Sequence, residues 1–180
     1  MSQPDLEFRT AWQRQDLNLQ ETAIDFWSSL GILPTQVNAQ DRAQELCVVA
    51  YADDLVAGVS TAVVAELPQL RNRFAFMRCA VAPGRRGQHI ATALTQQSAR
   101  VLSSWSEANP ALRVAGMAIV VESPALAPLE KFPVWPARDA DLETMAGLNL
   151  VGFTQAGQQI RVAWFTHTLI EMFMVEANEV

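Results

Sequence analysis

Cysteine, histidine and tyrosine are scarce in this sequence, and their scarcity argues against several kinds of site. Two cysteines and two histidines are scattered along the chain, and none of them stands at a spacing typical of metal ligands, so we expect no metal centre. Cys47 and Cys79 both lie in apolar, strand-like runs. We expect them to be buried free thiols of a reducing compartment rather than parts of a disulfide framework.

Basic residues are also few relative to acidic ones. The chain has 13 lysines and arginines against 19 aspartates and glutamates, which gives a formal net charge of −6. Because nucleic acid binding needs a basic face, this balance argues against nucleic acid as a main partner, whereas it suits a cationic amine. The first ten residues, MSQPDLEFRT, have no basic stretch followed by an apolar core, and no apolar run approaches ~20 residues. We therefore expect a cytoplasmic protein with no signal peptide and no membrane span.

Hydrophobic residues, in contrast, make up 50% of the 180 positions, which is enough for one well-packed domain and cramped for two. No repeat, low-complexity tract or linker divides the chain, so we expect residues 1–180 to form one domain. Apolar periodicity predicts an α/β (α+β) protein. The expected strands are 6–12, 45–52, 55–66, 74–81, 113–121, one opened by Gly152-Phe153, and 160–166; the expected helices are 17–30, a short one within 35–42, 90–105 and 139–148.

A few residues set the expected boundaries of these elements. Asp16 is a good helix N-cap, and Gly31 is suited to ending the same helix. Asp53 and Asp54 stand between two strand candidates, where they predict a tight hairpin turn. The segment 123–137 contains four prolines and cannot form one regular helix.

The stretch from Val81 to Leu94, VAPGRRGQHIATAL, carries the strongest functional signal. It follows an apolar run typical of a buried strand and leads into an amphipathic helical pattern. The first turn of a helix has N–H groups with no partner inside the helix, and the helix dipole favours negative charge there. Arg85 and Arg86 add cationic donors at the same place, so the stretch predicts a site for a pyrophosphate group. The alternative is a polar strand-to-helix connection without a ligand.

The order of residues in this stretch resembles motif A of the GNAT superfamily of N-acetyltransferases, Val-x-Pro-x-x-Arg-[Arg/Gly]-x-Gly-[Ile/Leu]-[Gly/Ala]-x-x-Leu. The resemblance implies a GNAT-like mixed, mostly antiparallel central sheet that is flanked by helices and split between the strands 74–81 and 113–121. The expected element order is similar to that fold over nearly the whole chain. His89 departs from the pattern, because most members have a glycine there that lets the backbone approach the pyrophosphate closely.

The resemblance further implies acetyl-CoA as cosubstrate and an amine of a small molecule or protein as acceptor. In the family, the backbone of the strand pairs with the pantetheine arm, and the following turn holds the pyrophosphate. Two alternatives stay open: a GNAT-like module that holds acyl-CoA without catalysis, and a protein whose Arg-Arg-Gly turn binds another phosphorylated ligand. The cofactor-binding residues implied by the resemblance are Cys79, Ala80, Val81, Arg86, Gly87, Gln88, His89, Ile90, Ala91 and Thr92.

Side chains for acid–base chemistry are less clearly marked. Family members often use a tyrosine on the last helix as general acid, in the pattern Tyr-x-x-x-Gly-Phe. Counting back from Gly152-Phe153 places Leu148 there, so this acid is absent. Glu122, which ends the strand that opens the central gap, is the best candidate base, and Glu66 is the second. Either carboxylate could instead be a solvated group at the end of a strand.

The proline-rich segment 123–137 is longer than the usual link between strand and helix in the family. Loops at strand ends commonly carry specificity. Phe132 and Trp135 could wall an acceptor pocket, with Glu130 offering a charge. They could equally cover a homodimer contact or anchor the segment on the core, and the sequence does not decide among these.

Overall fold

The computed structural model describes residues 5–135 and 147–169, so the expected helix 139–148 lies almost wholly outside the described residues. Within these two ranges, four short 3-10 helices connect the main elements: η1 (Pro68–Leu70), η2 (Pro83–Arg85), η3 (Pro110–Leu112) and η4 (Pro124–Lys131). The main elements are β1 (Glu7–Thr10), α1 (Leu17–Leu30), α2 (Ala39–Gln44), β2 (Leu46–Ala52), β3 (Leu55–Leu67), β4 (Asn72–Val81), α3 (Ile90–Ala108), β5 (Val114–Val120), β6 (Val134–Trp135), β7 (Leu148–Phe153) and β8 (Gln159–Trp164).

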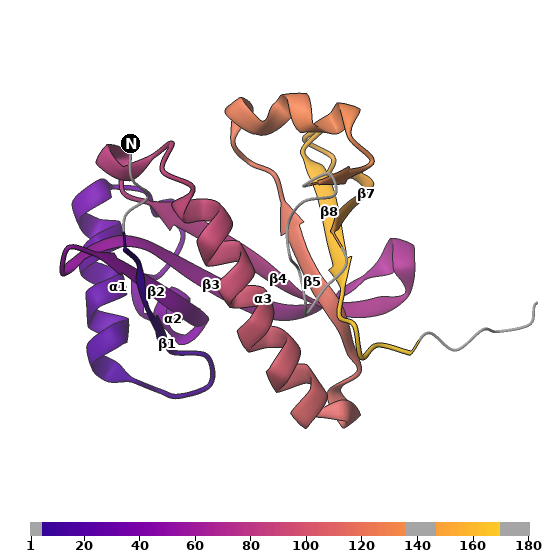
Figure 1. The fold of residues 1–180 in the computed structure, drawn as a ribbon, viewed down its shortest axis with the longest axis horizontal. Helices are drawn as coiled ribbons and strands as arrows, with labels where there is room; N and C mark the ends of the chain where they lie inside the picture. The colour runs from indigo at the N-terminus through magenta and orange to yellow at the C-terminus, as the bar shows by residue number, and fades with distance from the viewer. Residues whose placement is uncertain (1–4, 136–146, 170–180) are drawn as a thin grey trace, which may run out of the picture.

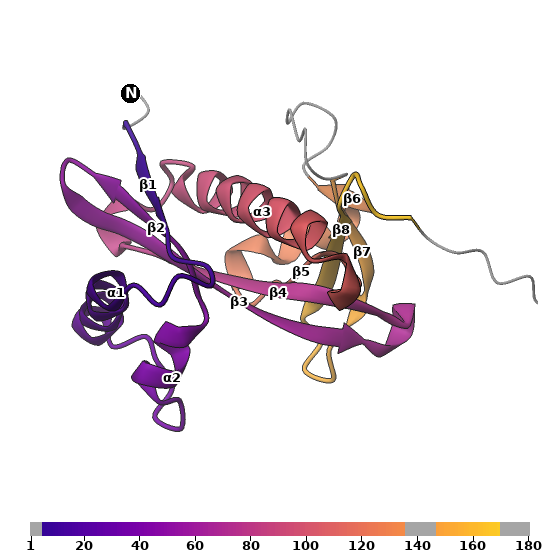
Figure 2. The ribbon, with the colours of Figure 1, turned by 90° about the horizontal axis from the view of Figure 1, so that it is seen from below.

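The described strands form one sheet in the order β1-β2-β3-β4-β5-β8-β7-β6. The pair β4–β5 is parallel and the other neighbours are antiparallel, which confirms the prediction of a mixed, mostly antiparallel sheet. The helix α3 crosses one face of this sheet (Figure 1). The helices α1 and α2 lie on the opposite face, near β1 to β3 (Figure 2).

The residues at the two ends of α1 and in the turn between β2 and β3 act as the sequence predicted. The side chain of Asp16 accepts a hydrogen bond from the Leu19 backbone N–H at 3.1 Å, and Gly31 ends α1 in the left-handed conformation. Asp53 and Asp54 have φ angles of 53° and 61°, as a two-residue turn between antiparallel strands requires. These predictions are confirmed. Each of these residues acts only on neighbours a few positions away, so the local sequence was enough to predict its effect.

The two faces of the sheet are packed differently. Beneath α3, a single apolar cluster includes Met77 of β4, Met117 of β5 and Leu94 of the helix. The opposite face carries two separate clusters. One is covered by α1 and α2, and the other gathers around Phe74 and Ile160 at the far end of the sheet.

The strands β4 and β5 diverge, as the resemblance implied. β4 stays paired with β3 over its whole length, with Val81 opposite Gly58. Its pairing with β5 ends where Met77 meets Ile119, so the stretch from Arg78 onward has no partner strand on that side. The sheet is therefore split at the carboxyl ends of its two parallel strands.

The C-terminal strands correct two sequence predictions. β7 begins at Leu148, so Gly152-Phe153 closes a strand rather than opening one. Leu148 is fully buried and pairs with Trp135 of β6. The position counted back to the family's tyrosine therefore lies on a strand and not on a helix. Leu148 belongs to a strand because it pairs with neighbouring strands, and the local sequence does not predict such pairing well.

Candidate functional site

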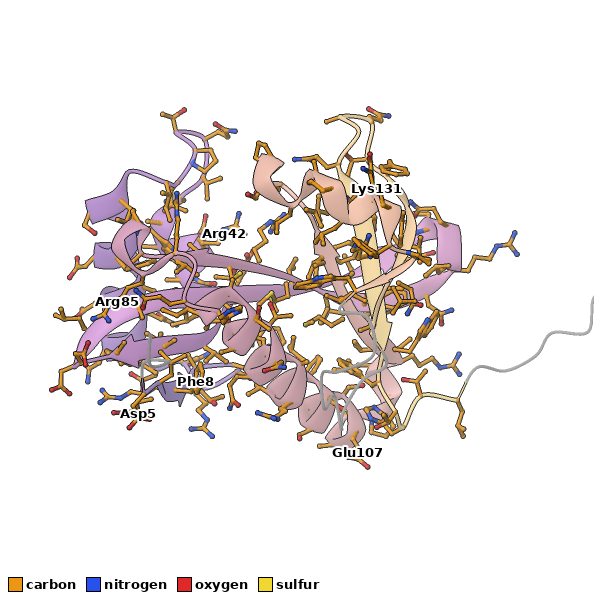
Figure 3. The ribbon with its side chains drawn as sticks, turned by 45° about the horizontal axis from the view of Figure 1, so that its top comes forward. Asp5, Phe8, Arg42, Arg85, Glu107 and Lys131 are labelled. Carbon is orange, nitrogen blue, oxygen red and sulfur yellow. The ribbon has the colours of Figure 1, made fainter. Side chains whose placement is uncertain are left out.

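A hollow of about 230 Å³ lies where β4 ends and α3 begins. Seven residues line this hollow: six of them are predicted cofactor-binding residues, and the seventh is Arg85. Arg85 appears at this end of the molecule in Figure 3. The lining residues are Val81, Arg85, Arg86, Gly87, His89, Ile90 and Ala91.

The turn in front of α3 has the backbone conformation that a glycine-rich anion loop needs. Gly87 has a φ of +77°, and a Cβ added there would meet no atom within 4 Å, so the space in front of it is open. His89 is the N-cap of α3 and is also left-handed, with φ 59° and ψ 13°. Its side chain makes no capping hydrogen bond, so it does not occupy the free N–H groups of the first helical turn.

The two arginines of the turn have different roles in the structure. Arg85 Nη2 forms an ion pair with Asp53 Oδ2 at 2.7 Å, which ties the turn to the β2–β3 hairpin. Arg85 also lines the hollow, so its role as an anion donor stays a prediction. Arg86 is exposed and, within residues 5–135 and 147–169, takes part in no ion pair. None of these residues competes with a ligand for its guanidinium.

The backbone of β4 offers hydrogen-bonding groups to the split. Ala82 N donates to Ala57 O of β3 at 2.9 Å. Because successive residues of a strand point their N–H and C=O groups to alternate sides, those of Cys79 and Val81 point away from β3 and toward β5. At this level the pairing with β5 has ended. An extended ligand can pair with these groups as an added strand would.

The two cysteines differ, which corrects the expectation that both are buried. Cys47 is fully buried, and burial raises the pKa of its thiol to about 12. Cys79 is exposed because β5 diverges beside it. The protein packed around Cys79 nevertheless raises the pKa of its thiol to about 11 by desolvation. A protonated thiol is a poor nucleophile, so neither cysteine is suited to covalent catalysis at neutral pH.

The structure separates the two predicted bases. Glu122 is exposed and follows the end of β5, at the same edge of the sheet as Val81, because β4 and β5 are parallel. Glu66 stands opposite Arg73, near the start of β4. At ~3.3 Å per residue, this register puts Glu66 about 26 Å along the sheet from the level of Val81. Glu122 therefore lies at the split and Glu66 does not.

The proline-rich segment is held by a buried arginine that sequence reasoning missed. Arg161 of β8 is fully buried and donates to the carbonyl oxygens of Leu129 at 2.6 Å, Phe132 at 2.9 Å and Leu148 at 3.1 Å. Its Nε also donates to Gln159 Oε1. Desolvation lowers the pKa of Arg161. The one available signal was a charged residue inside the otherwise apolar run of β8.

These contacts support anchoring as a role of the proline-rich segment. Gln159 Nε2 donates to Ala127 O at 3.0 Å, which adds a further bond to η4. Trp135 packs against the cluster beneath α3, whereas Phe132 is 49% exposed and Glu130 is exposed. Trp135 is thus tied to the core while Phe132 lies at the surface, and a role of either in an acceptor pocket stays a prediction.

Within residues 5–135 and 147–169, no three His, Cys, Asp or Glu side chains are grouped so that they could hold a metal ion. No helix in the same ranges is both long and apolar enough to cross a membrane.

Comparison with known proteins rests on solved structures. No family model and no curated protein matches the sequence. Naa50 of Arabidopsis thaliana, in complex with the bisubstrate analogue CoA-Ac-MVNAL, is 14% identical with a TM-score of 0.51, over 88% of this chain and 97% of that one.

Two further structures cover most of the chain with lower scores. The acetyltransferase of the GNAT family from Streptococcus pneumoniae is 9% identical, over 89% of this chain and 98% of that one, with a TM-score of 0.47. A predicted acetyltransferase with acetyl-CoA from Clostridium acetobutylicum is 16% identical, over 76% and 92%, with a TM-score of 0.45. The likeness to Naa50, the strand order and the split between β4 and β5 show that the chain has the fold of the GNAT acetyltransferases.

Proposed function

We propose that the protein binds acyl-CoA, with acetyl-CoA as the cosubstrate, and transfers the acyl group to a primary amine. The observation that carries this proposal is the hollow at the junction of β4 and α3, which the predicted pyrophosphate-binding residues line. The complex of Naa50 with a CoA-containing analogue, in the same fold, supports it.

The residues present fit an anionic, amide-bearing ligand. The first-turn N–H groups of α3 and the exposed guanidinium of Arg86 would hold the pyrophosphate. Gly87 leaves the approach to that turn open. The free N–H and C=O groups of Cys79 and Val81 would pair with the amides of the pantetheine arm.

The chemistry needs few side chains. Acyl-CoA supplies a thioester carbonyl and a thiolate leaving group of low basicity. A backbone N–H on the free side of β4 would polarise the carbonyl, as an oxyanion site does. Glu122, exposed at the same edge of the sheet, would accept the proton of the acceptor ammonium directly or through water. Holding the two reactants together in the split would supply much of the remaining rate enhancement.

A second candidate function is a module that binds acyl-CoA without transferring it. Two observations favour it: Leu148, a residue without an acidic group, is buried on a strand, and His89 replaces a glycine of the motif. Turnover with a broad panel of primary amines separates this candidate from the enzyme. Two free thiols and an acyl-CoA cosubstrate suit a cytoplasmic location for either function.

Binding is tested first by thermal unfolding and isothermal titration with acetyl-CoA. A ligand at ~100 times its Kd should stabilise the protein by ~2.7 kcal/mol. Gly87→Val should abolish the effect, because valine strains a left-handed backbone and fills the open approach. Arg86→Ala should weaken binding and reduce its salt dependence. Arg100→Gln, which removes an exposed charge from the body of α3, is the control and should bind as the parent protein does.

Equal CoA affinity in all four proteins would contradict the pyrophosphate assignment. Displacement of acetyl-CoA by free nucleotides at comparable concentration would instead favour the interpretation of a site for another phosphorylated ligand.

A further inference from the structure

The face of the sheet opposite α3 carries a charged residue between its two apolar clusters. On β4, Phe76 packs against the cluster around Phe74, and Ala80 packs against the cluster under α1 and α2. Side chains on a strand alternate between faces, so Arg78 lies on the same face, between these two residues. It is exposed, and it stands where the pairing of β4 with β5 has just ended.

The guanidinium of Arg78 has no partner among residues 5–135 and 147–169. It takes part in no ion pair and in no side-chain hydrogen bond there. The residue opposite it on β3 is Thr61, which is uncharged. Arg42 of α2, on the same face, is already paired with Glu45 at 2.9 Å. None of the described residues therefore competes with a ligand for this charge in a central strand.

The position of Arg78 in the chain places this charge beside the proposed reaction centre. It immediately precedes Cys79, whose backbone groups point into the split. Glu122 lies across the split at the same edge of the sheet. An anionic group bound by Arg78 would thus hold the rest of a small molecule within a few residue lengths of both, since a strand rises ~3.3 Å per residue.

We propose that Arg78 determines acceptor specificity and that the acceptor is a small amine that also carries a carboxylate, as amino acids do. The planar guanidinium recognises a carboxylate through two parallel hydrogen bonds. The ammonium group of the same molecule would then face Glu122 and the β4 backbone. This inference rests on the proposed function, since it concerns the second substrate of the same site.

The test uses pairs of acceptors that differ only in the carboxylate, namely amino acids and their carboxamides. Values of kcat/KM for each pair are measured with the parent protein, Arg78→Gln and Arg78→Lys. Arg100→Gln serves as the control for loss of one positive charge. Comparing each variant with the parent protein cancels the difference in amine basicity between an acid and its amide.

We expect Arg78→Gln to lower the preference for acid over amide by about 10- to 100-fold, the effect of one charge-assisted pair. The value of kcat/KM should fall far less for the amides than for the acids, and the affinity for CoA should stay close to that of the parent protein. Arg78→Lys should restore part of the preference, and Arg100→Gln should leave it intact. An unchanged preference in Arg78→Gln would overturn the inference while leaving the proposed transferase activity standing.

Failure of the proposed function gives a different result. If the parent protein acetylates no amine, the same pairs are titrated calorimetrically against the protein in the presence of CoA. Binding of acids that is lost in Arg78→Gln would still support the carboxylate site. Binding that does not distinguish acid from amide, or no binding at all, would overturn it.

Discussion

The conformation of His89 makes the substitution His89→Gly informative about both stability and ligand binding. The residue has a φ of 59° at the start of α3, where its side chain is exposed and makes no capping hydrogen bond. Replacing it with glycine therefore removes a Cβ from a left-handed position and sacrifices no buried contact.

The magnitude follows from two opposing effects. A residue with a Cβ in the left-handed region costs ~1–2 kcal/mol, which glycine would recover. Glycine in turn makes the unfolded chain more flexible and costs roughly 0.5–1 kcal/mol. The net expectation is a gain of about 0.5–1 kcal/mol. For a chain of this length, 1 kcal/mol corresponds to a rise in Tm of about 2–4 °C.

The assay is thermal unfolding of the free protein, with Gln88→Gly as the matched control. Gln88 is the neighbouring residue and does not have a positive φ, so glycine brings no relief there and should lower Tm. A fall in Tm for His89→Gly as large as that for Gln88→Gly would refute the argument from backbone strain.

Titration with CoA completes the test of His89. Because backbone N–H groups at a helix start suffice to bind an anion, His89→Gly should keep or improve CoA affinity. If the ring itself contacts phosphate, the same change should weaken binding. A loss of CoA affinity in His89→Gly would therefore contradict the backbone account.

Four further predictions concern stability and thiol reactivity. Gly116→Ala should destabilise by about 1–3 kcal/mol in urea unfolding, because its Cβ would collide with the backbone of β8, whereas Gly84→Ala meets no atom within 4 Å and should be near neutral. Arg161→Met should cost about 2–5 kcal/mol in the same assay, since it removes the hydrogen bonds to the carbonyl oxygens of Leu129, Phe132 and Leu148, and an unchanged midpoint would refute that role. An alkylating reagent should modify Cys79 in the folded protein slowly at pH 7 and faster toward pH 11, while Cys47 should react only after unfolding. Mass spectrometry of the labelled peptides gives the order of reaction, and labelling of Cys47 before Cys79 would contradict the prediction. Because the raised pKa values keep both thiols protonated in the folded state, their contribution to stability is complete below pH ~9 and is lost as pH rises toward 11 to 12.

The sequence by itself determined the features whose cause is local. The N-cap at Asp16, the end of α1 at Gly31 and the turn at Asp53-Asp54 each depend on one or two residues and their neighbours. The turn before α3 belongs to the same class, because a strand, a proline–glycine break and a helix start are all written within one short stretch. Motif A and the expected element order were sufficient to predict the fold.

The tertiary structure alone decided which of those residues are available to a ligand. Arg85 and Arg86 are equivalent in the sequence, but the distant Asp53 pairs with Arg85, whereas no residue in the described part of the chain pairs with Arg86. The exposure of Cys79 follows from the divergence of β4 and β5, and Arg78 stands where that divergence begins. Strand divergence depends on how whole helices and strands pack together. The sequence around a residue therefore does not show where a strand from a distant part of the chain stops pairing with it.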